Sequence, residues 1–231
     1  MASNGGMLPA LHPTENQLGR DITAYLPAAP PADRVRDADR DVWELAAPYL
    51  KVRDNDGHTI YAYGLARALL AAHPEAEAEV VLPAILLHDT GWSQAPPDQI
   101  LEAIAPGGWR PGLVLLHEGE GARIAREILT ELGRPAAIID RVVEIIDGHD
   151  SRLVSLSIED SLVKDADKLW RLTPHGVDTV MRWFGLARDQ AYRLIASRVH
   201  DHLFTDTART MAQVLAAVAW VDSSPERVAL G

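Results

Sequence analysis

The sequence of 231 residues contains no cysteine. Disulfide bonds and thiolate metal ligands are therefore excluded, so a bound metal would need nitrogen and oxygen donors. The lack of cysteine suits a reducing compartment, and we expect a cytoplasmic protein. Long apolar runs are also missing: none approaches the about 18 residues of a membrane span. The opening residues, MASNGGMLPALHPTENQ, lack the basic flank and apolar core of a secretory signal, so we expect no membrane partner.

Basic residues are scarce relative to acidic ones. The 22 Lys and Arg residues stand against 33 Asp and Glu residues, which gives a formal net charge of −11. Because phosphate backbones are bound by clustered Lys and Arg, we expect no nucleic-acid partner. The hydrophobic fraction of 47% and the charged fraction of 24% are ordinary for a globular protein with a sizeable core.

Strand patterns are scarce as well, and helical spacing of apolar residues dominates. Residues 1–37 are rich in Pro and Ala, and we predict an extended arm there, followed by one domain over residues 38–231. The sequence therefore predicts an all-α domain. Its expected helices cover residues 40–52, 58–73, 77–89, 97–105, 114–132, 135–150 and 157–172, with two or three more within 177–220.

Four of the nine histidines are spaced almost evenly along the chain. His58, His88, His117 and His149 are separated by 30, 29 and 32 residues. Each interval fits one helix and one connection, so neighbouring helices can each direct one imidazole to a common interior point. Asp89 follows His88 directly, at the end of the apolar run LPAILL.

These residue types point to metal chemistry. Without thiolates, neutral imidazole and carboxylate are the ligands that hold Zn, Fe, Mn or Co. Two metal ions roughly 3.5–4 Å apart are usually bridged, and a carboxylate has two oxygens for that purpose. Asp89, next to a candidate histidine ligand, is well placed to bridge. A further acidic pair, Asp165 and Asp167, lies in VKDADKLW.

The order of these residues, H…HD…D, resembles the HD-domain superfamily of metal-dependent phosphohydrolases over about residues 40–185. KDADKLW resembles the closing helix of that family, which favours Asp167 over Asp165 as the ligand. His117 and His149 stand where dinuclear members have additional ligands. The resemblance implies an HD-domain helical bundle with two divalent ions, most often Fe or Mn, with Mg, Co or Zn as alternatives. The implied ligands are His58, His88, Asp89, His117, His149 and Asp167.

The sequence departs from the family pattern at one position. Many dinuclear hydrolases that it resembles have a phosphate-contacting Lys just after the HD-x-G turn, whereas this chain has Trp92. Lys164 lies three residues before Asp167 and so shares its helical face, which makes it a substitute anion contact. Arg152 is another. With Asp89, these two residues are the predicted catalytic groups.

Three functions are compatible with this pattern. The first is hydrolysis of a small, anionic phosphorylated compound by metal-activated water. The second is a mixed-valent diiron oxygenase that cleaves a C–C or C–P bond of a small polar substrate. The third is a binding module with a degraded site, which ranks last because all the matched ligand residues are present. The oligomeric state is left open.

The remaining candidates have simpler interpretations. Asp165 is expected to support the site or to be solvated, and Asp150 is expected to hydrogen-bond a ligand or to lie in a solvated loop. Trp92 and Trp109 are expected at a pocket rim, whereas Trp170, Trp183 and Trp220 are expected in the core. The histidines expected to be structural or exposed are His12, His73, His175, His200 and His202.

Overall fold

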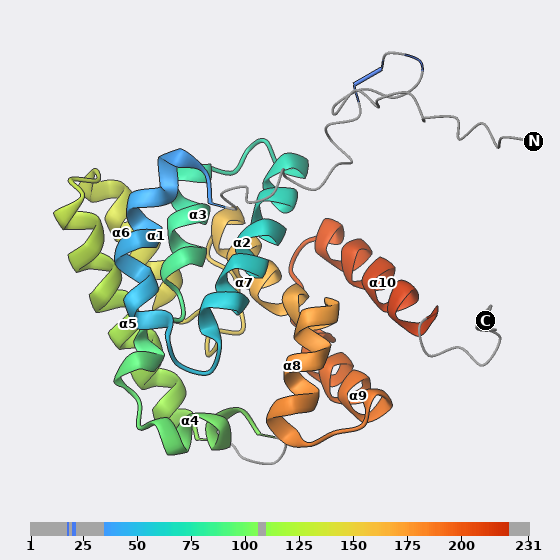
Figure 1. Cartoon of the computed structure of the whole chain (residues 1–231). Coiled ribbons are helices and arrows are strands. Elements are labelled where there is room, and N and C mark those ends of the chain that lie inside the picture. The colour runs from blue at the N-terminus through green and yellow to red at the C-terminus, as the bar shows by residue number, and fades with distance from the viewer. Residues whose placement is uncertain (1–17, 19, 22–34, 106–109, 222–231) are drawn as a thin grey trace, which may run out of the picture. The chain divides into compact units, whose positions relative to one another are not determined.

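The computed structural model describes residues 18, 20, 21, 35–105 and 110–221 (Figure 1). The chain divides into two units, Met1–Arg34 and Val35–Gly231, and the second unit holds all the candidate ligands. Most of the arm predicted for residues 1–37 lies outside the described residues, as do His12 and Trp109, so those expectations stay predictions.

The second unit is helical, which confirms the predicted all-α class; the residues that can be described contain no strand. The described part of the chain contains short 3₁₀ turns as well as α-helices: η2 (Asp37–Asp39), η3 (Ala47–Leu50), η4 (Thr90–Gln94) and η5 (Trp170–Leu172). The α-helices are α1 (Arg40–Ala46), α2 (Asn55–Ala72), α3 (Ala78–Leu87), α4 (Pro97–Ile104), α5 (Pro111–Glu131), α6 (Ala136–Ile146), α7 (Ile158–Leu169), α8 (Pro174–Phe184), α9 (Arg188–Val199) and α10 (Asp206–Val221).

The helix ends depart from the sequence prediction where the backbone has a local reason to turn. The helix predicted for 40–52 is divided into α1 and η3, and Pro48 lies in the first turn of η3. The helix predicted for 135–150 stops at Ile146, because Asp147 leaves the helical conformation and Gly148 has a φ of +123°. His149 therefore lies in a loop.

Two predicted helix ends are found as expected. The Ser157 hydroxyl caps α7 by accepting a hydrogen bond from the Asp160 amide at 3.2 Å. Gly133 follows α5 with a φ of +66°, the left-handed conformation that favours glycine at this position. These caps fix where α5 stops and α7 begins.

Helix α3 lies at the centre of the bundle and packs against α1, α2, α5, α6 and α7. Every residue from Val80 to Leu87 is buried, which explains why this stretch is apolar on all sides. In Figure 1, α5 and α6 lie on one side of α3, and α2 and α7 lie on the other, with α8, α9 and α10 beyond them. The last turn of α3 therefore ends among the helices that carry the other candidate ligands. No helix among the described residues combines the length and apolar character needed to cross a bilayer.

Candidate metal centre

The structure brings the six predicted ligands together in the interior of the bundle. His58 comes from the start of α2, and His88 and Asp89 follow α3. His117 lies in α5, Asp167 in α7, and His149 in the loop after α6. All six side chains are buried. Residues separated by long intervals of sequence thus share one site because their helices surround the end of α3.

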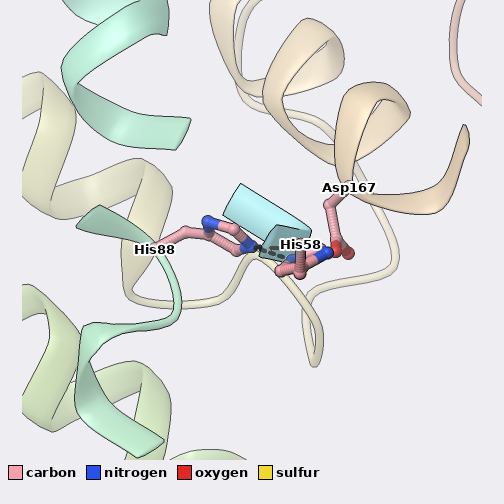
Figure 2. A group of neighbouring side chains, drawn as sticks. All are labelled: His58, His88 and Asp167. Atoms are coloured by element: carbon pink, nitrogen blue, oxygen red, sulfur yellow. Dashed lines mark hydrogen bonds and ion pairs between the residues drawn. The ribbon is translucent and has the colours of Figure 1, made fainter. Parts of the chain in front are cut away.

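The first group of donors consists of His58, His88 and Asp167 (Figure 2). The two imidazole Nε2 atoms are 3.0 Å apart. Asp167 Oδ1 lies 3.4 Å from His58 Nε2 and 3.7 Å from His88 Nε2. Donors about 2.1 Å from one ion and about 90–110° apart are roughly 3.0–3.4 Å from each other. Two of the three separations fall in this range and the His88–Asp167 separation is slightly longer, so the three donors could hold a single metal ion.

The second group consists of His117, His149 and Asp150. The Nε2 atoms of the two histidines are 3.2 Å apart. Asp150 Oδ2 lies 3.7 Å from His117 Nε2 and 4.0 Å from His149 Nε2. The structure thus adds Asp150 to the residues that could hold an ion. From the sequence, Asp150 is expected only to hydrogen-bond a ligand or to lie in a solvated loop.

Asp89 lies between the two groups. Its Oδ2 atom is 3.3 Å from His58 Nε2. Its Oδ1 atom is 3.7 Å from the Nε2 atoms of His88 and His149 and 3.8 Å from that of His117. Oδ2 thus faces His58 of the first group, and Oδ1 lies between His88 of that group and the two histidines of the second, a position from which a carboxylate could bridge two ions.

Hydrogen bonds orient two of the imidazoles. Nδ1 of His88 lies 2.9 Å from the Ile85 carbonyl, and Nδ1 of His149 lies 2.9 Å from the Ile146 carbonyl. Since a carbonyl only accepts, each Nδ1 donates its proton, and Nε2 is the ring nitrogen that faces the site. This is the nitrogen that would bind a metal.

Burial and charge set the protonation of the site. Burial lowers the pKa of His58 and of His117 to about 3, so both are neutral at neutral pH. Burial also lowers the pKa of His149, but its hydrogen bond with Asp89 and the negative charge of Asp150 outweigh burial and raise it to about 9. Against the effect of burial, the neighbouring His88, His149 and His58 hold the pKa of Asp89 well below its usual range. Carboxylates that stay ionised in a buried site create a strong preference for a cation.

Two side chains that the sequence analysis did not assign to the centre hold its parts in place. Trp92 Nε1–H donates to Asp89 Oδ1 at 3.0 Å, and its indole stacks on His117 with ring centroids 4.0 Å apart. Trp92 is therefore buried against the ligands, and it also lines a small cavity at the cluster. Glu118 Oε1 accepts hydrogen bonds from the amides of Asp150 and Ser151 at 2.8 and 2.7 Å, which fixes the loop that carries His149. Only the position of Glu118 next to His117 could have indicated this role.

Three cations face the cluster. The Arg53 guanidinium lies 3.4 Å from Asp89 Oδ2 and is held between the rings of Trp92 and Trp183, 4.8 and 5.2 Å from their centroids. Lys168 Nζ is 2.5 Å from both Asp150 Oδ1 and Asp167 Oδ2. Arg171 lies 3.7 Å from Asp167 Oδ2. Lys168 and Arg171 follow Asp167 by one and four residues, but nothing in the sequence singles out Arg53.

The structure does not bring Lys164 and Arg152 to this cluster. Lys164 is buried, and its Nζ donates to the carbonyls of Arg152 and Val154 at 3.1 and 3.0 Å and to Asp160 Oδ2 at 3.2 Å. The Arg152 guanidinium donates to the Glu144 carbonyl at 2.8 Å. These contacts tie the loop after His149 to α6 and α7, and they do not support the predicted contact with substrate.

Asp165 differs from both roles expected for it. Its carboxylate accepts hydrogen bonds from the Phe204 amide at 2.7 Å, the Thr205 amide at 3.0 Å and the Thr205 hydroxyl at 2.7 Å. It is fully buried, so it is not solvated, and it anchors the segment before α10. Asp167, two residues later, faces the candidate ligands, as the motif implied.

The other aromatic and histidine residues follow the expectations in part. Trp170 is buried and packs edge-on against His58 with ring centroids 4.5 Å apart, but Trp220 is 56% exposed, so its predicted core position is wrong. Among the remaining histidines, His73 hydrogen-bonds Glu75 and Thr207, and His200 and His202 are exposed. The second His-Asp dipeptide, at 200–201, is therefore outside the site.

Two cavities adjoin the cluster. The smaller, of about 20 Å³, is lined by ligands and by Arg53, Trp92 and Trp183. The larger, of about 380 Å³, shares Asp150 and Arg171 with the smaller one and extends toward α4 and α9. Its volume is in the range of pockets that hold small organic ligands.

A helical bundle that gathers four histidines and their carboxylates around a His-Asp pair has the arrangement expected of an HD domain. The chain matches the family described as HD domain over residues 55–172, just over half of its length, and it belongs to that family. The resemblance seen in the motif is thereby confirmed. In fold the chain is similar to a crystal structure described as a predicted HD superfamily hydrolase from an uncultured Thermotogales bacterium. The TM-score is 0.54 and the identity is 20%, over 80% of this chain and 89% of that one. No curated protein matches the chain.

Proposed function

We propose that this HD-domain protein is a metal-dependent phosphohydrolase that acts on a small phosphorylated compound. The observation that carries the proposal is the pair of donor groups joined by Asp89, beside a cavity of about 380 Å³ with a cationic wall. The donors are nitrogen and oxygen atoms only, which suits Fe or Mn first and Mg, Co or Zn as alternatives. His58, His88 and Asp167 would hold one ion, and His117 and His149 the other.

Bound divalent ions would supply Lewis acidity toward a phosphoryl oxygen and would lower the pKa of water. The contribution of the chain is orientation and charge. Asp89 sets the spacing of the two donor groups, and Trp92 restrains Asp89 through the indole N–H. Arg53, Lys168 and Arg171 place positive charge beside the cluster, where the charge of a phosphate group would be stabilised.

In this proposal, cations other than Lys164 and Arg152 contact the phosphate group of the substrate. The cations that line the two cavities are Arg53, Lys168, Arg171 and Arg198, and the first three lie within 4 Å of a carboxylate of the cluster. Arg53 is the strongest candidate for a phosphate contact, because its guanidinium lies within 3.4 Å of the central Asp89.

A metal-reconstitution assay tests the proposal. Protein stripped with a chelator would be reloaded with Mn, Fe, Co or Mg and assayed for phosphate release from a panel of small phosphate monoesters. We expect turnover with at least one metal and its loss in Asp89→Asn, whereas Asp201→Asn, which alters the exposed His-Asp dipeptide, keeps wild-type activity. Absence of turnover with every metal would contradict the proposal.

One observation favours a second function, a mixed-valent diiron oxygenase acting on a small polar substrate. At the position where the resemblance leads one to expect a phosphate-contacting Lys, Trp92 instead contacts His117 and Asp89. The metal centre thus has an aromatic side chain at a point where a hydrolase would have a cation.

Iron analysis and electron paramagnetic resonance of anaerobically and aerobically handled protein separate the two functions. A mixed-valent signal from two irons supports the oxygenase, and a redox-silent metal supports the hydrolase. Protein without bound metal would instead favour a binding module.

A further inference from the structure

The larger cavity is lined by three cations, of which two belong to the ligand cluster. Lys168 and Arg171 contact Asp167, and Arg198 is the third. Apolar side chains, those of Ala103, Ile104, Ala105 and Val114, line the same cavity. A ligand that fills this cavity therefore meets both positive charge and hydrocarbon.

Arg198 differs from the other cations in how it is neutralised. Lys168 and Arg171 are each within 4 Å of Asp167, whereas no carboxylate among the described residues lies within 4 Å of the Arg198 guanidinium. Its one hydrogen bond to a described residue is donated to the Ile104 carbonyl at 2.5 Å. A guanidinium has five N–H donors in a planar fork, so most of this hydrogen-bonding capacity remains available to a ligand.

Arg198 is also placed against a like charge. Burial lowers its pKa, the charge of Arg171 lowers it further, and the more distant charge of Asp150 opposes these effects without outweighing them. Two guanidinium groups that face one cavity repel each other unless an anion lies between them. Their positions on η5 and α9 are fixed by packing, so the charge pair is built into the fold, and α9 lies outside the region matched by the HD family.

The geometry points to a second anion subsite, formed by Arg198 with Arg171, that selects phosphate esters carrying another negative group such as a carboxylate. This inference rests on the proposed function for the position of the phosphate group at the ligand cluster. Asp150, beside His117 and His149, and Arg198 line the same cavity. A small substrate would place its ester phosphate at the ligand cluster and its second anion against Arg198 and Arg171, with its carbon chain in contact with Ile104 and Val114.

Binding of two matched esters to manganese-loaded protein tests the subsite. 3-Phosphoglycerate and glycerol 3-phosphate differ only in a carboxylate in place of a hydroxymethyl group. By titration calorimetry, we expect wild-type protein to bind the carboxylate ester roughly tenfold more tightly, the effect of one charge-assisted hydrogen bond. In Arg198→Gln the preference should disappear while the affinity for glycerol 3-phosphate is unchanged, and Arg198→Lys should restore part of it.

Arg193→Gln is the matched control, because Arg193 is exposed on the same helix and its loss changes the net charge equally. It should keep the full preference. Equal affinity for the two esters in the wild type, no binding of either, or an equal loss for both in a folded Arg198→Gln variant would overturn the inference. Phosphate release is measured on the same samples: selective binding without hydrolysis would sink the proposed function alone, and hydrolysis without selectivity would sink the subsite alone.

Discussion

Asp89 is the residue on which both halves of the centre depend. Its two oxygens face different imidazoles, and Trp92 and Arg53 hold the carboxylate in that orientation. An amide at this position would keep the size of the side chain but would lose the negative charge and one of the two oxygens. A neutral group with a single acceptor cannot serve both donor groups.

We therefore expect Asp89→Asn to weaken metal binding by at least roughly 100-fold, since changes at residues that only support ligands already cost about 10–100-fold. Elemental analysis after dialysis and competition with a chelator measure the effect. Asp201→Asn is the control, because Asp201 also follows a histidine but its side chain is 83% exposed. Equal metal content in the two variants would contradict a bridging role for Asp89.

Individual residues also show what sequence reasoning can and cannot use. The six candidate ligands can be chosen because helix-sized intervals separate the histidines and because Asp89 and Asp167 lie in recognisable motifs. Lys164 is a candidate because it shares a helical face with Asp167, but α7 is buried on nearly all sides. A neighbouring loop supplies the Arg152 and Val154 carbonyls that take up its ammonium group. Arg53 contacts Asp89 only because the two residues, 36 positions apart in the sequence, are brought together by tertiary packing. No local sequence pattern predicts this contact.

At the scale of elements, the position of the site depends on the close approach of η4 to α5. A Cβ added to Gly91 would lie 1.9 Å from the His117 carbonyl oxygen and 2.5 Å from the Gly121 amide nitrogen. Both atoms belong to the backbone of α5, so neither can move without moving the helix that carries His117. The Gly of the HD-x-G turn is thus required by packing.

We expect Gly91→Ala to lower the free energy of unfolding by about 3 kcal/mol, the upper part of the usual range for overpacking. Gly119→Ala, on the exposed side of the same α5, meets nothing within 4 Å and should be neutral or stabilising by up to about 1 kcal/mol. Urea denaturation of the two variants measures the contrast. If Gly91→Ala were as stable as wild type, the tight contact between η4 and α5 would be wrong.

Helix α7 separates two carboxylates that the sequence places two residues apart. Asp167 faces the ligand cluster, while Asp165 faces the segment before α10 and accepts three hydrogen bonds there.

We expect Asp165→Asn to lower the free energy of unfolding by about 2–3 kcal/mol, because the new amide nitrogen would face groups that themselves donate hydrogen bonds. The metal content should stay unchanged. Asp167→Asn should instead lower the metal content. Thermal melting combined with elemental analysis distinguishes them, and loss of metal in both folded variants would contradict this division of roles.

Helix boundaries can be predicted from the sequence only where a residue at the boundary itself stops the helix, through a capping side chain or a left-handed backbone conformation. Ser157 and Gly133 mark their helix ends through a hydroxyl acceptor and a left-handed backbone. The sequence of α6 contains no capping residue that would announce its early end, because apolar residues continue to Ile146. The turn depends instead on Gly148, which follows the helix, and on Glu118 of α5, whose side chain accepts a hydrogen bond from the loop after α6. This is why the sequence predicts a helical His149, whereas the residue lies in a loop.

At the scale of the whole molecule, three carboxylates meet at one point of the fold: Asp89 and Asp167 are buried and Asp150 is partly buried. Arg53, Lys168 and Arg171 lie within 4 Å of them. Their other neighbours include imidazoles, two of which burial keeps neutral. Carboxylates in such a setting carry an electrostatic cost that a cation relieves.

Removal of metal should therefore destabilise the whole fold, because the donors come from α2, α3, α5, α7 and the loop after α6. An ion that binds only the folded state contributes about 2.7 kcal/mol when its concentration is 100 times its dissociation constant. For a chain of this size that corresponds to a fall in melting temperature of about 5–10 °C on adding a chelator. Differential scanning calorimetry of metal-loaded protein with and without the chelator measures the shift.

The double variant His88→Ala, Asp89→Ala should melt at the same temperature with and without the chelator, while Asp201→Asn should behave as wild type. A chelator shift of the same size in the double variant would show that the stabilising ion binds elsewhere, because the variant removes a ligand of the first donor group and the carboxylate that lies between the two groups.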